Sequence, residues 1–420
     1  MPPPDLPRER GRKGSPPAWR VGMGANRPTR RARFRPSHYP NLIMGRFIMK
    51  VTTTRKELLE GVQTVAHAVS GRSSLPILQH IHLNAEEDGV KLTATDLEIG
   101  IECFVPAAVE MPGEATVPAR LTQEVLSSLP DAEVKMSDDA THAVQLLCER
   151  SEYKLLGLPP AEYPSLPEVS DATSFTVPAD TLKEMIKQTI FAVSTEETRA
   201  ILTGVLVEYD GVTLRMVATD THRLTVRSHP VGVNALETPI AAVIPARAMN
   251  ELARIVGDYE GEVEVQIGKN QASFRPVDDP RRTFLITRLI DGQFPAYQRV
   301  IPTAYTKRLT LATEEFLRAV RRASLVARDI SNRLILSTNG EYLIIEAESG
   351  QSGKAHEEVE VVREGDDITV AFNARYLIDV LNVIDSEGVH LELTESLRPA
   401  VIRPVDQDNY LCVLMPMALT

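Results

Sequence analysis

The sequence is poor in the residues that would indicate a disulfide scaffold, a metal centre or a membrane protein. Its 420 residues include one tryptophan, three cysteines and 5% aromatic residues. Cys103, Cys148 and Cys412 are scattered, without a C-x-x-C pattern or a histidine at metal-ligand spacing. This pattern argues against disulfides and zinc and fits a reducing compartment. We expect three small buried side chains, no metal and no cofactor. No stretch approaches the roughly 18 consecutive apolar residues of a membrane span, so we expect no membrane partner.

Familiar catalytic motifs are also missing, because the chain has no G-x-S-x-G, no P-loop and no dinucleotide-binding glycine pattern. One stretch, ATDTHRL (218–224), invites an enzymatic interpretation in which Asp220 and His222 form an acid–base pair. A related stretch, ATDLEIG (94–100), keeps the aspartate as Asp96 but has no histidine. We interpret the shared Ala-Thr-Asp as a hairpin turn in which the aspartate caps its own backbone. The sequence therefore predicts no catalytic residue and no enzyme.

The charge is unevenly distributed along the chain. Residues 1–48 contain 11 Lys or Arg and two acidic residues, a net charge of +9, together with nine prolines and no helical or strand periodicity. Since the whole chain carries −11, residues 49–420 carry −20. Such a basic, proline-rich segment is typical of disorder. Two interpretations stay open: a flexible arm that touches nucleic acid, or an extension read from a misplaced start codon upstream of Met49. We favour the second.

The main feature that is present is a threefold repeat. VPARLTQEVLSSL (117–129), IPARAMNELARIV (244–256) and FNARYLIDVLNVI (372–384) follow one another at spacings of 127 and 128 residues. Each predicts an amphipathic helix that follows a strand. One apolar stripe is expected on each helix, with its anchors four residues apart: Val125/Leu129, Leu252/Val256 and Val380/Ile384.

A second triplet of helices is predicted over 54–70, 178–194 and 312–328. Their expected anchors are Leu58/Val62, Leu182/Ile186 and Phe316/Val320, with Thr54 and Thr313 as N-caps.

Alternating strands follow each of these helices, and the turns EDG, YDG and TNG lie where a hairpin requires positive φ. The strands outnumber the helices and are joined by tight turns, which predicts an α+β fold with antiparallel sheets. The expected domains are 49–170, 171–300 and 301–420, after the extension 1–48. They are three tandem copies of one unit.

Five motifs carry a more specific resemblance: LPIL (75–78), ATDTHRL (218–224), DGQFPAYQRV (291–300), FNARYLIDVL (372–381) and VLMPMAL (413–419). In this order, across residues 49–420, they resemble the bacterial sliding clamp, the beta subunit of DNA polymerase III. The resemblance implies a ring-shaped homodimer around duplex DNA, with antiparallel sheets outside and two helices per domain lining the interior. It implies a processivity factor that slides without sequence specificity, located in the cytoplasm at the nucleoid.

An acidic protein that encloses DNA needs its cations on the inner face, because phosphate is contacted by Lys and Arg. The helical pattern places Arg318, Arg321 and Arg322 opposite the apolar stripe of the third domain. Candidate DNA-binding residues on other helices are Lys183, Lys187, Arg247 and Arg254. The resemblance adds Arg72 and Arg199.

The resemblance also implies a hydrophobic cleft between the second and third domains. This cleft would bind short linear peptides of the replicative DNA polymerase, the clamp loader, translesion polymerases and mismatch-repair proteins. The implied cleft residues are Leu202, Thr219, His222, Arg223, Leu224, Pro295, Arg299, Val300, Asn373, Tyr376, Leu397, Pro399, Val413, Leu414, Met415, Pro416 and Met417. Methionine side chains adapt to varied apolar partners, and Arg223 and Arg299 are expected to hold peptide carbonyls or acidic groups.

For the dimer contact, the resemblance implies Tyr153 and Leu155 in the first domain and Ser324 and Leu325 in the third. Edge strands that pair with a second chain would cover otherwise exposed backbone. A competing interpretation is a repeat scaffold that never encloses DNA, and the native mass distinguishes the two because a scaffold could be monomeric.

Overall fold

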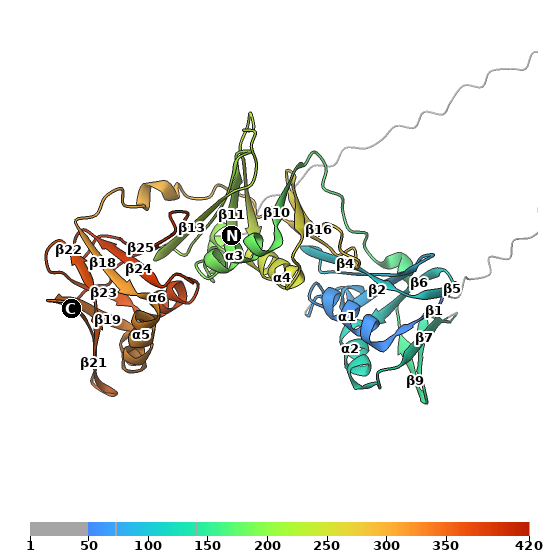
Figure 1. Cartoon of the computed structure of the whole chain (residues 1–420). Coiled ribbons are helices and arrows are strands. Elements are labelled where there is room, and N and C mark those ends of the chain that lie inside the picture. Colours follow the sequence, from blue (N-terminus) through green and yellow to red (C-terminus); the bar gives the residue numbers. More distant parts are fainter. Residues whose placement is uncertain (1–48, 72–73, 140, 420) are drawn as a thin grey trace, which may run out of the picture. The chain divides into compact units, whose positions relative to one another are not determined.

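The computed structural model describes residues 49–71, 74–139 and 141–419. The predicted extension 1–48 and the predicted DNA-binding residue Arg72 lie outside the described residues. The described chain is an α+β protein in which every strand pair is antiparallel, as the sequence predicts (Figure 1).

Two smaller sheets belong to the first and last parts of the chain. One has five strands, in the spatial order β5 (Ala108–Met111), β1 (Lys50–Thr54), β7 (Glu133–Asp138), β8 (Ala143–Cys148) and β9 (Ser151–Leu156). The other has four strands, in the order β21 (Gly353–Glu360), β20 (Tyr342–Ser349), β19 (Arg333–Asn339) and β23 (Thr369–Asn373). β9 and β21 are edge strands of these sheets.

Two larger sheets each combine strands from consecutive repeats. The eight-stranded sheet has the order β10 (Thr173–Pro178), β15 (Glu262–Ile267), β16 (Gln271–Pro276), β17 (Phe284–Arg288), β4 (Ile99–Pro106), β3 (Gly89–Thr95), β2 (His80–Ala85) and β6 (Gly113–Pro118). The nine-stranded sheet has the order β14 (Ile240–Pro245), β11 (Gly204–Tyr209), β12 (Thr213–Thr219), β13 (Arg223–Pro230), β26 (Tyr410–Leu414), β25 (Ala400–Pro404), β24 (Gly388–Leu393), β18 (Lys307–Ala312) and β22 (Val362–Glu364).

The repeats are joined by backbone pairing at two places. We call the β4–β17 pair the first junction and the β13–β26 pair the second junction. Ladder hydrogen bonds across them continue one sheet from each repeat into the next, so neither strand is left as an exposed edge. The junctions therefore fix the register of consecutive repeats.

The helices form three pairs, one per repeat: α1 (Arg55–Ala66) with α2 (Ala119–Ser128), α3 (Ala179–Ile190) with α4 (Ala246–Val256), and α5 (Thr313–Ala327) with α6 (Ala374–Leu381). All twelve predicted anchors are buried, with exposed fractions of 8% or less. The helical periodicity is therefore confirmed in all three repeats, because one apolar face of each helix packs on a sheet.

The predicted caps and turns are only partly confirmed. Thr54 caps α1 by accepting a hydrogen bond from the backbone N–H of Glu57. The prediction for Thr313 is wrong: Ala312 is the N-cap of α5, and the buried Thr313 hydroxyl has no hydrogen-bond partner among the described residues. Gly211 and Gly340 adopt the predicted positive φ. Gly89 does not, and it is required because a Cβ there would lie 2.4 Å from the carbonyl oxygen of Val105.

The core is apolar and includes all three cysteines, as predicted. One polar group within it is unusual. Tyr410 in β26 is 1% exposed, and its hydroxyl has no hydrogen-bond partner among the described residues. Burial raises the pKa of this phenol well above its ordinary value, so the group stays neutral.

Tyr410→Phe is expected to stabilise the protein. The change removes only an oxygen that was taken from water without a replacement hydrogen bond, and leaving such a group unpaired costs about 1–3 kcal/mol. Scanning calorimetry should show a melting temperature raised by up to a few degrees. A lower melting temperature would show that the hydroxyl has a stabilising contact.

Candidate functional site

The second junction brings together eight of the seventeen residues predicted for the partner-binding cleft. β13 and β26 pair Arg223 with Leu414 and Leu224 with Val413, and the backbone N–H of Met415 donates to the His222 carbonyl over 2.9 Å. The ring of Tyr376 in α6 stacks on His222 with 6.4 Å between centroids. Thr219, at the end of β12, donates its hydroxyl to the Arg223 carbonyl over 2.7 Å.

The other predicted cleft residues lie on three neighbouring segments. Asn373 caps α6, and Met417 bonds to Ala371 in β23. Pro295, Arg299 and Val300 lie in or beside η4 (Tyr297–Val300), the linker that leads to the third repeat, and Leu397, Pro399 and Pro416 lie in loops that flank β25 and β26. Leu202, at the end of η3 (Glu197–Leu202), is buried, and its carbonyl accepts a bond from the Ser194 N–H.

The surface at this junction combines a buried floor with exposed apolar side chains. Leu224 and Val413 are 3% and 2% exposed and belong to one apolar cluster with Tyr297. Met415 and Leu397 are 42% and 69% exposed. Exposed apolar side chains beside a buried apolar floor favour docking of an apolar partner.

Arg223 is committed to contacts within the chain. Its Nε donates to Asp220 over 3.0 Å, and its Nη1 and Nη2 donate to Asp379 and to the Phe191 carbonyl, each over 2.5 Å. The guanidinium also lies over the rings of Phe191 and Tyr376, at 5.2 and 4.6 Å from their centroids. This contradicts the expectation of a side chain free to hold a peptide. Arg223 instead ties α3 and β13 to α6.

Sequence reasoning missed Phe191 and Asp379, the two residues that complete this arrangement. Asp379 lies three residues after Tyr376, so both share one face of α6, and this spacing was the available signal. Burial, followed by the charge of Asp220, raises the pKa of Tyr376 above its ordinary value. The phenol therefore stays neutral against the arginine.

A cavity of about 440 Å³ adjoins the linker beside this junction, and Phe294 and Pro295 are in its lining. Below the linker, the Tyr297 hydroxyl donates to Glu208 over 2.7 Å, and Arg215 lies 3.4 Å from the same carboxylate. Burial raises the pKa of Tyr297 to about 12. This partly buried bond anchors the linker on the sheet.

The Ala-Thr-Asp motif acts as the predicted turn. Asp220 Oδ1 accepts bonds from the backbone N–H groups of His222 and Arg223, both over 2.9 Å. Asp96 does the same for Glu98 and Ile99, over 3.0 and 2.9 Å. In both repeats the aspartate carboxylate accepts hydrogen bonds from the backbone of its own turn. The Asp220 carboxylate is therefore not oriented as a base toward the His222 ring.

The predicted DNA-binding cations are half-exposed, and each lies beside an acidic or neutral acceptor. Arg247 pairs with Asp96, and Arg254 contacts Glu251 over 2.9 Å and the ring of His67. The remaining described pairs are Lys183 with Asp258, Lys187 with Asp385, Arg199 with Glu196, Arg318 with Glu314, Arg321 with Asn382 and Arg322 with Glu357. Exposed pairs of this kind are weak, so a phosphate could replace the acceptor.

The residues predicted for the dimer contact differ in exposure. Leu325 on α5 is 58% exposed and Tyr153 on β9 is 36% exposed. The Ser324 hydroxyl donates to the Arg321 carbonyl in its own helix. Leu155 is 2% exposed and lies in the core of its own repeat, so its side chain cannot reach a partner. Its neighbour Leu156 is 70% exposed.

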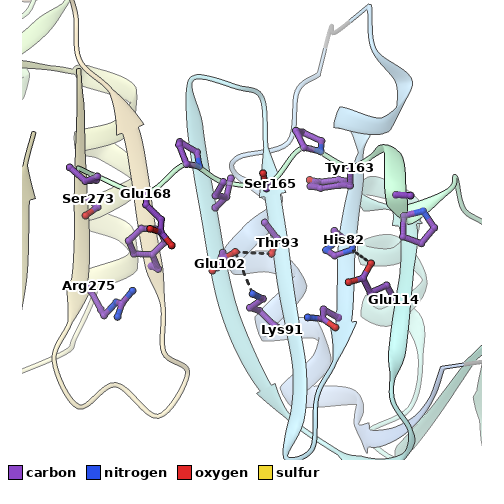
Figure 2. Close-up of a pocket in the computed structure, with 18 of the residues that line it drawn as sticks. His82, Lys91, Thr93, Glu102, Glu114, Tyr163, Ser165, Glu168, Ser273 and Arg275 are labelled. Carbon is purple, nitrogen blue, oxygen red and sulfur yellow. Dashed lines mark hydrogen bonds and ion pairs between the residues drawn. The ribbon is translucent and has the colours of Figure 1, made fainter. Parts of the chain in front are cut away.

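The first junction carries a polar cavity of about 740 Å³. Figure 2 shows His82, Thr93 and Glu102 pointing into it from the sheet, below the linker that carries Tyr163. The His82 and Tyr163 rings stack at 5.2 Å. Burial lowers the pKa of His82, against the opposing effect of Glu114. The face of the sheet below the linker is therefore polar at the first junction and apolar at the second.

Within the described residues, no group of three or more His, Cys, Asp or Glu side chains is arranged to hold a metal ion. Among the described helices, none combines the length and apolar character that crossing a membrane requires.

Three family models match the chain in order. They are the N-terminal domain of the DNA polymerase III beta subunit over residues 49–167, its central domain over 176–296 and its C-terminal domain over 298–418. Together they cover most of the chain and all three repeats.

Whole-length relatives agree. The chain is 33% identical to the beta sliding clamp of Bacillus subtilis over 380 residues, covering 88% of this chain and 99% of the relative. It is also 33% identical to the beta sliding clamp of Halalkalibacterium halodurans over 381 residues, with the same coverage. The crystal structure of the Bacillus subtilis sliding clamp has a TM-score of 0.84 over 89% of this chain and 100% of that chain, at 33% identity.

The sliding clamp of Pseudomonas aeruginosa bound to griselimycin also gives a TM-score of 0.84, at 32% identity over 88% of this chain and 100% of that chain. Both the sequence and the fold therefore match over all three repeats. The chain belongs to the bacterial beta sliding clamps, the non-catalytic processivity factors of DNA polymerase III.

Proposed function

We propose that two copies of this chain close into a ring that encircles duplex DNA, slides without reading sequence, and tethers proteins through the second junction. The proposed domains are 49–170, 171–300 and 301–420. The proposed partners are the replicative polymerase, the clamp loader, translesion polymerases and mismatch-repair proteins. The cytoplasm, at the nucleoid, is the proposed location. The observation that carries the proposal is the repeated unit itself: a helix pair packed on a sheet, joined twice by the same strand pairing.

The distribution of charge supports binding by enclosure. Residues 49–420 carry −20, which opposes general attachment to DNA, whereas the described candidate cations lie on α3, α4 and α5, apart from Arg199 in η3. Because these cations already have acceptors within the chain, each phosphate contact replaces an existing pair and its net gain is small. A protein that holds DNA by topology requires such weak and exchangeable contacts.

For partner binding, we propose that Met415, Leu397 and Val300 provide the apolar contact over the floor formed by Leu224 and Val413. Val300 is 51% exposed. Arg223 has a positioning role, because it holds Tyr376 in place through the ring contact and Asp379. This reassigns Arg223 from a peptide ligand to the support of the Tyr376 wall.

For ring closure, we propose that β9 of one protomer lies against β21 of its partner, since both are edge strands of their own sheets. Leu325, Tyr153 and Leu156 would supply apolar contact. Leu155 is removed from the proposed interface because it is buried in its own repeat.

Closed circular DNA should retain the protein when the salt concentration is raised, and linear DNA of the same sequence should release it. The reason is that a ring loaded by its clamp loader leaves only over an end, whereas salt weakens phosphate contacts on both forms equally. Gel filtration of loaded plasmid before and after a single cut measures this. Equal retention on both forms would contradict enclosure.

Met415→Ala should weaken binding of a partner peptide by roughly 1–3 kcal/mol, the usual cost of truncating an apolar anchor. Calorimetric titration with a peptide from the replicative polymerase measures the change. Val233→Ala is the matched control, because Val233 is 89% exposed and lies outside the proposed cleft. Unchanged affinity in Met415→Ala would mean that the cleft lies elsewhere.

Arg223→Lys should also weaken peptide binding and lower the free energy of unfolding, because Arg223 ties α3 and β13 to α6. Lysine keeps the charge but cannot donate simultaneously to Asp220, Asp379 and the Phe191 carbonyl, so Tyr376 loses its support. The ¹⁹F NMR signal of Tyr376, in protein labelled with fluorotyrosine, should report the mobility of the ring. A sharp, unchanged Tyr376 signal together with lost affinity would instead show direct contact between Arg223 and the peptide.

A further inference from the structure

The two junctions are equivalent in register, and this allows their surfaces to be compared position by position. At the first junction, Gly100 pairs with Ile286, and the Arg288 N–H donates to the Glu98 carbonyl over 2.8 Å. At the second junction, Leu224 pairs with Val413, and the Met415 N–H donates to the His222 carbonyl over 2.9 Å. Arg288 therefore stands at the position of Met415.

The same comparison extends to the neighbouring strand and its turn. Ser273 pairs with Ile286 at the first junction, and Val401 pairs with Val413 at the second. Four residues earlier, in the turns that precede β16 and β25, the chain has Lys269 in the first case and Leu397 in the second. The turn before β16 is shorter than the loop before β25, so Lys269 lies at the tip of the turn that corresponds to the loop of Leu397.

The equivalent place at the first junction is hollow. A cavity of about 540 Å³ lies there, and its lining includes Lys269, Gln271, Arg288 and Val169 of the linker. Val169 follows its aromatic–proline pair by the same number of residues as Val300 follows Phe294–Pro295. The first repeat boundary therefore has a counterpart of the proposed partner cleft, with room for several side chains.

Two residues that line this cavity, Lys269 and Arg288, are cations. Arg288 replaces Met415, an exposed apolar side chain of the second junction, and Lys269 lies in the turn that corresponds to the loop of the exposed Leu397. Both cations are exposed, and neither forms a salt bridge with another described residue. A pair of exposed cations without ionic partners in a cavity favours anionic side chains.

Acidic residues occur nearby but not at the anchor positions. Asp171 and Asp291 also line the cavity. Their counterparts at the second junction follow the linker and the last strand, and neither counterpart is a residue of the proposed cleft. Glu98 and Glu168 stand where His222 and Arg299 stand, and neither lines this cavity. The two junctions thus carry different charges at equivalent positions, with Arg288 in place of Met415 and Glu168 in place of Arg299, a pattern that separates two kinds of partner.

The surface that adjoins this cavity is also more polar than its counterpart at the second junction. Leu206, Val217 and Val226 form part of the apolar cluster at the second junction, and the matching registers place polar side chains at their counterparts. These counterparts are the His82, Thr93 and Glu102 that Figure 2 shows pointing into the polar cavity. The polar character is continuous across the first junction.

We propose that the cavity at the first junction is a second docking site, which binds a linear peptide with acidic side chains where the partners of the second junction have apolar ones. Lys269 and Arg288 are its anchors. The site takes its geometry from the proposed partner cleft, so the proposal rests on that function. Residues 1–48, with a net charge of +9, have the wrong sign to occupy it.

Fluorescence anisotropy with labelled ten-residue peptides tests the site. One probe alternates Asp with Leu, the second has Ser in place of each Asp, and the third has Lys. The double variant Lys269→Leu with Arg288→Met should bind the Asp probe at least 10-fold more weakly than the unmodified chain, because it loses both cations. Met415→Ala should leave Asp-probe affinity within about twofold and weaken the Ser probe, which depends on the second junction.

A charge-reversal variant, Lys269→Glu with Arg288→Glu, should gain affinity for the Lys probe. Because a gain of binding cannot result from loss of folding, this variant tests the site independently of stability. Unchanged binding of the Asp probe by the Leu/Met variant would overturn the second site. So would a Lys probe that binds the Glu variant no better than the unmodified chain. A Ser probe indifferent to Met415→Ala would instead contradict the proposed partner cleft, so the two failures are distinguishable.

Discussion

The structure depends on antiparallel pairing between the last strand of one repeat and a strand of the repeat before it. At each junction the ladder satisfies backbone groups that would otherwise form an exposed edge, and it sets the register in which side chains from both repeats meet. The linkers then pack on the sheet, in one case through the partly buried bond from Tyr297 to Glu208. The candidate cleft at the second junction depends on this pairing, since Leu224 meets Val413 there, and the second candidate site contains Arg288 at the end of β17.

The candidate DNA-binding cations and the acidic excess lie in different parts of residues 49–420. The helices carry cations that already pair with acids or carbonyls, and the acidic excess lies elsewhere on residues 49–420. Such pairs are screened and exchangeable, which suits a protein that must keep DNA without holding one sequence. The same argument explains why the docking sites are chemically unlike: a repeat that is copied three times gains specificity only by changing the side chains at equivalent positions.

Much of the fold could be predicted from the sequence because helical and strand periods are local signals. The helix anchors, such as Leu252 and Phe316, were predicted correctly because burial follows the 3.6-residue period, and Asp220 and Asp96 because a turn is also local. Predictions that depended on distant parts of the chain were less successful. Arg223 is held by Asp379, 156 residues later, and the burial of Leu155 depends on how its sheet packs. Thr313 failed as a cap because the helix begins one residue too early for its side chain to serve.

Ring closure is the claim on which enclosure, sliding and partner tethering all depend. Sedimentation equilibrium over a wide range of protein concentration tests it without DNA or partners. The account predicts a reversible dimer, weakened by an acidic substitution at the exposed Leu325. A monomer at every concentration would contradict the account.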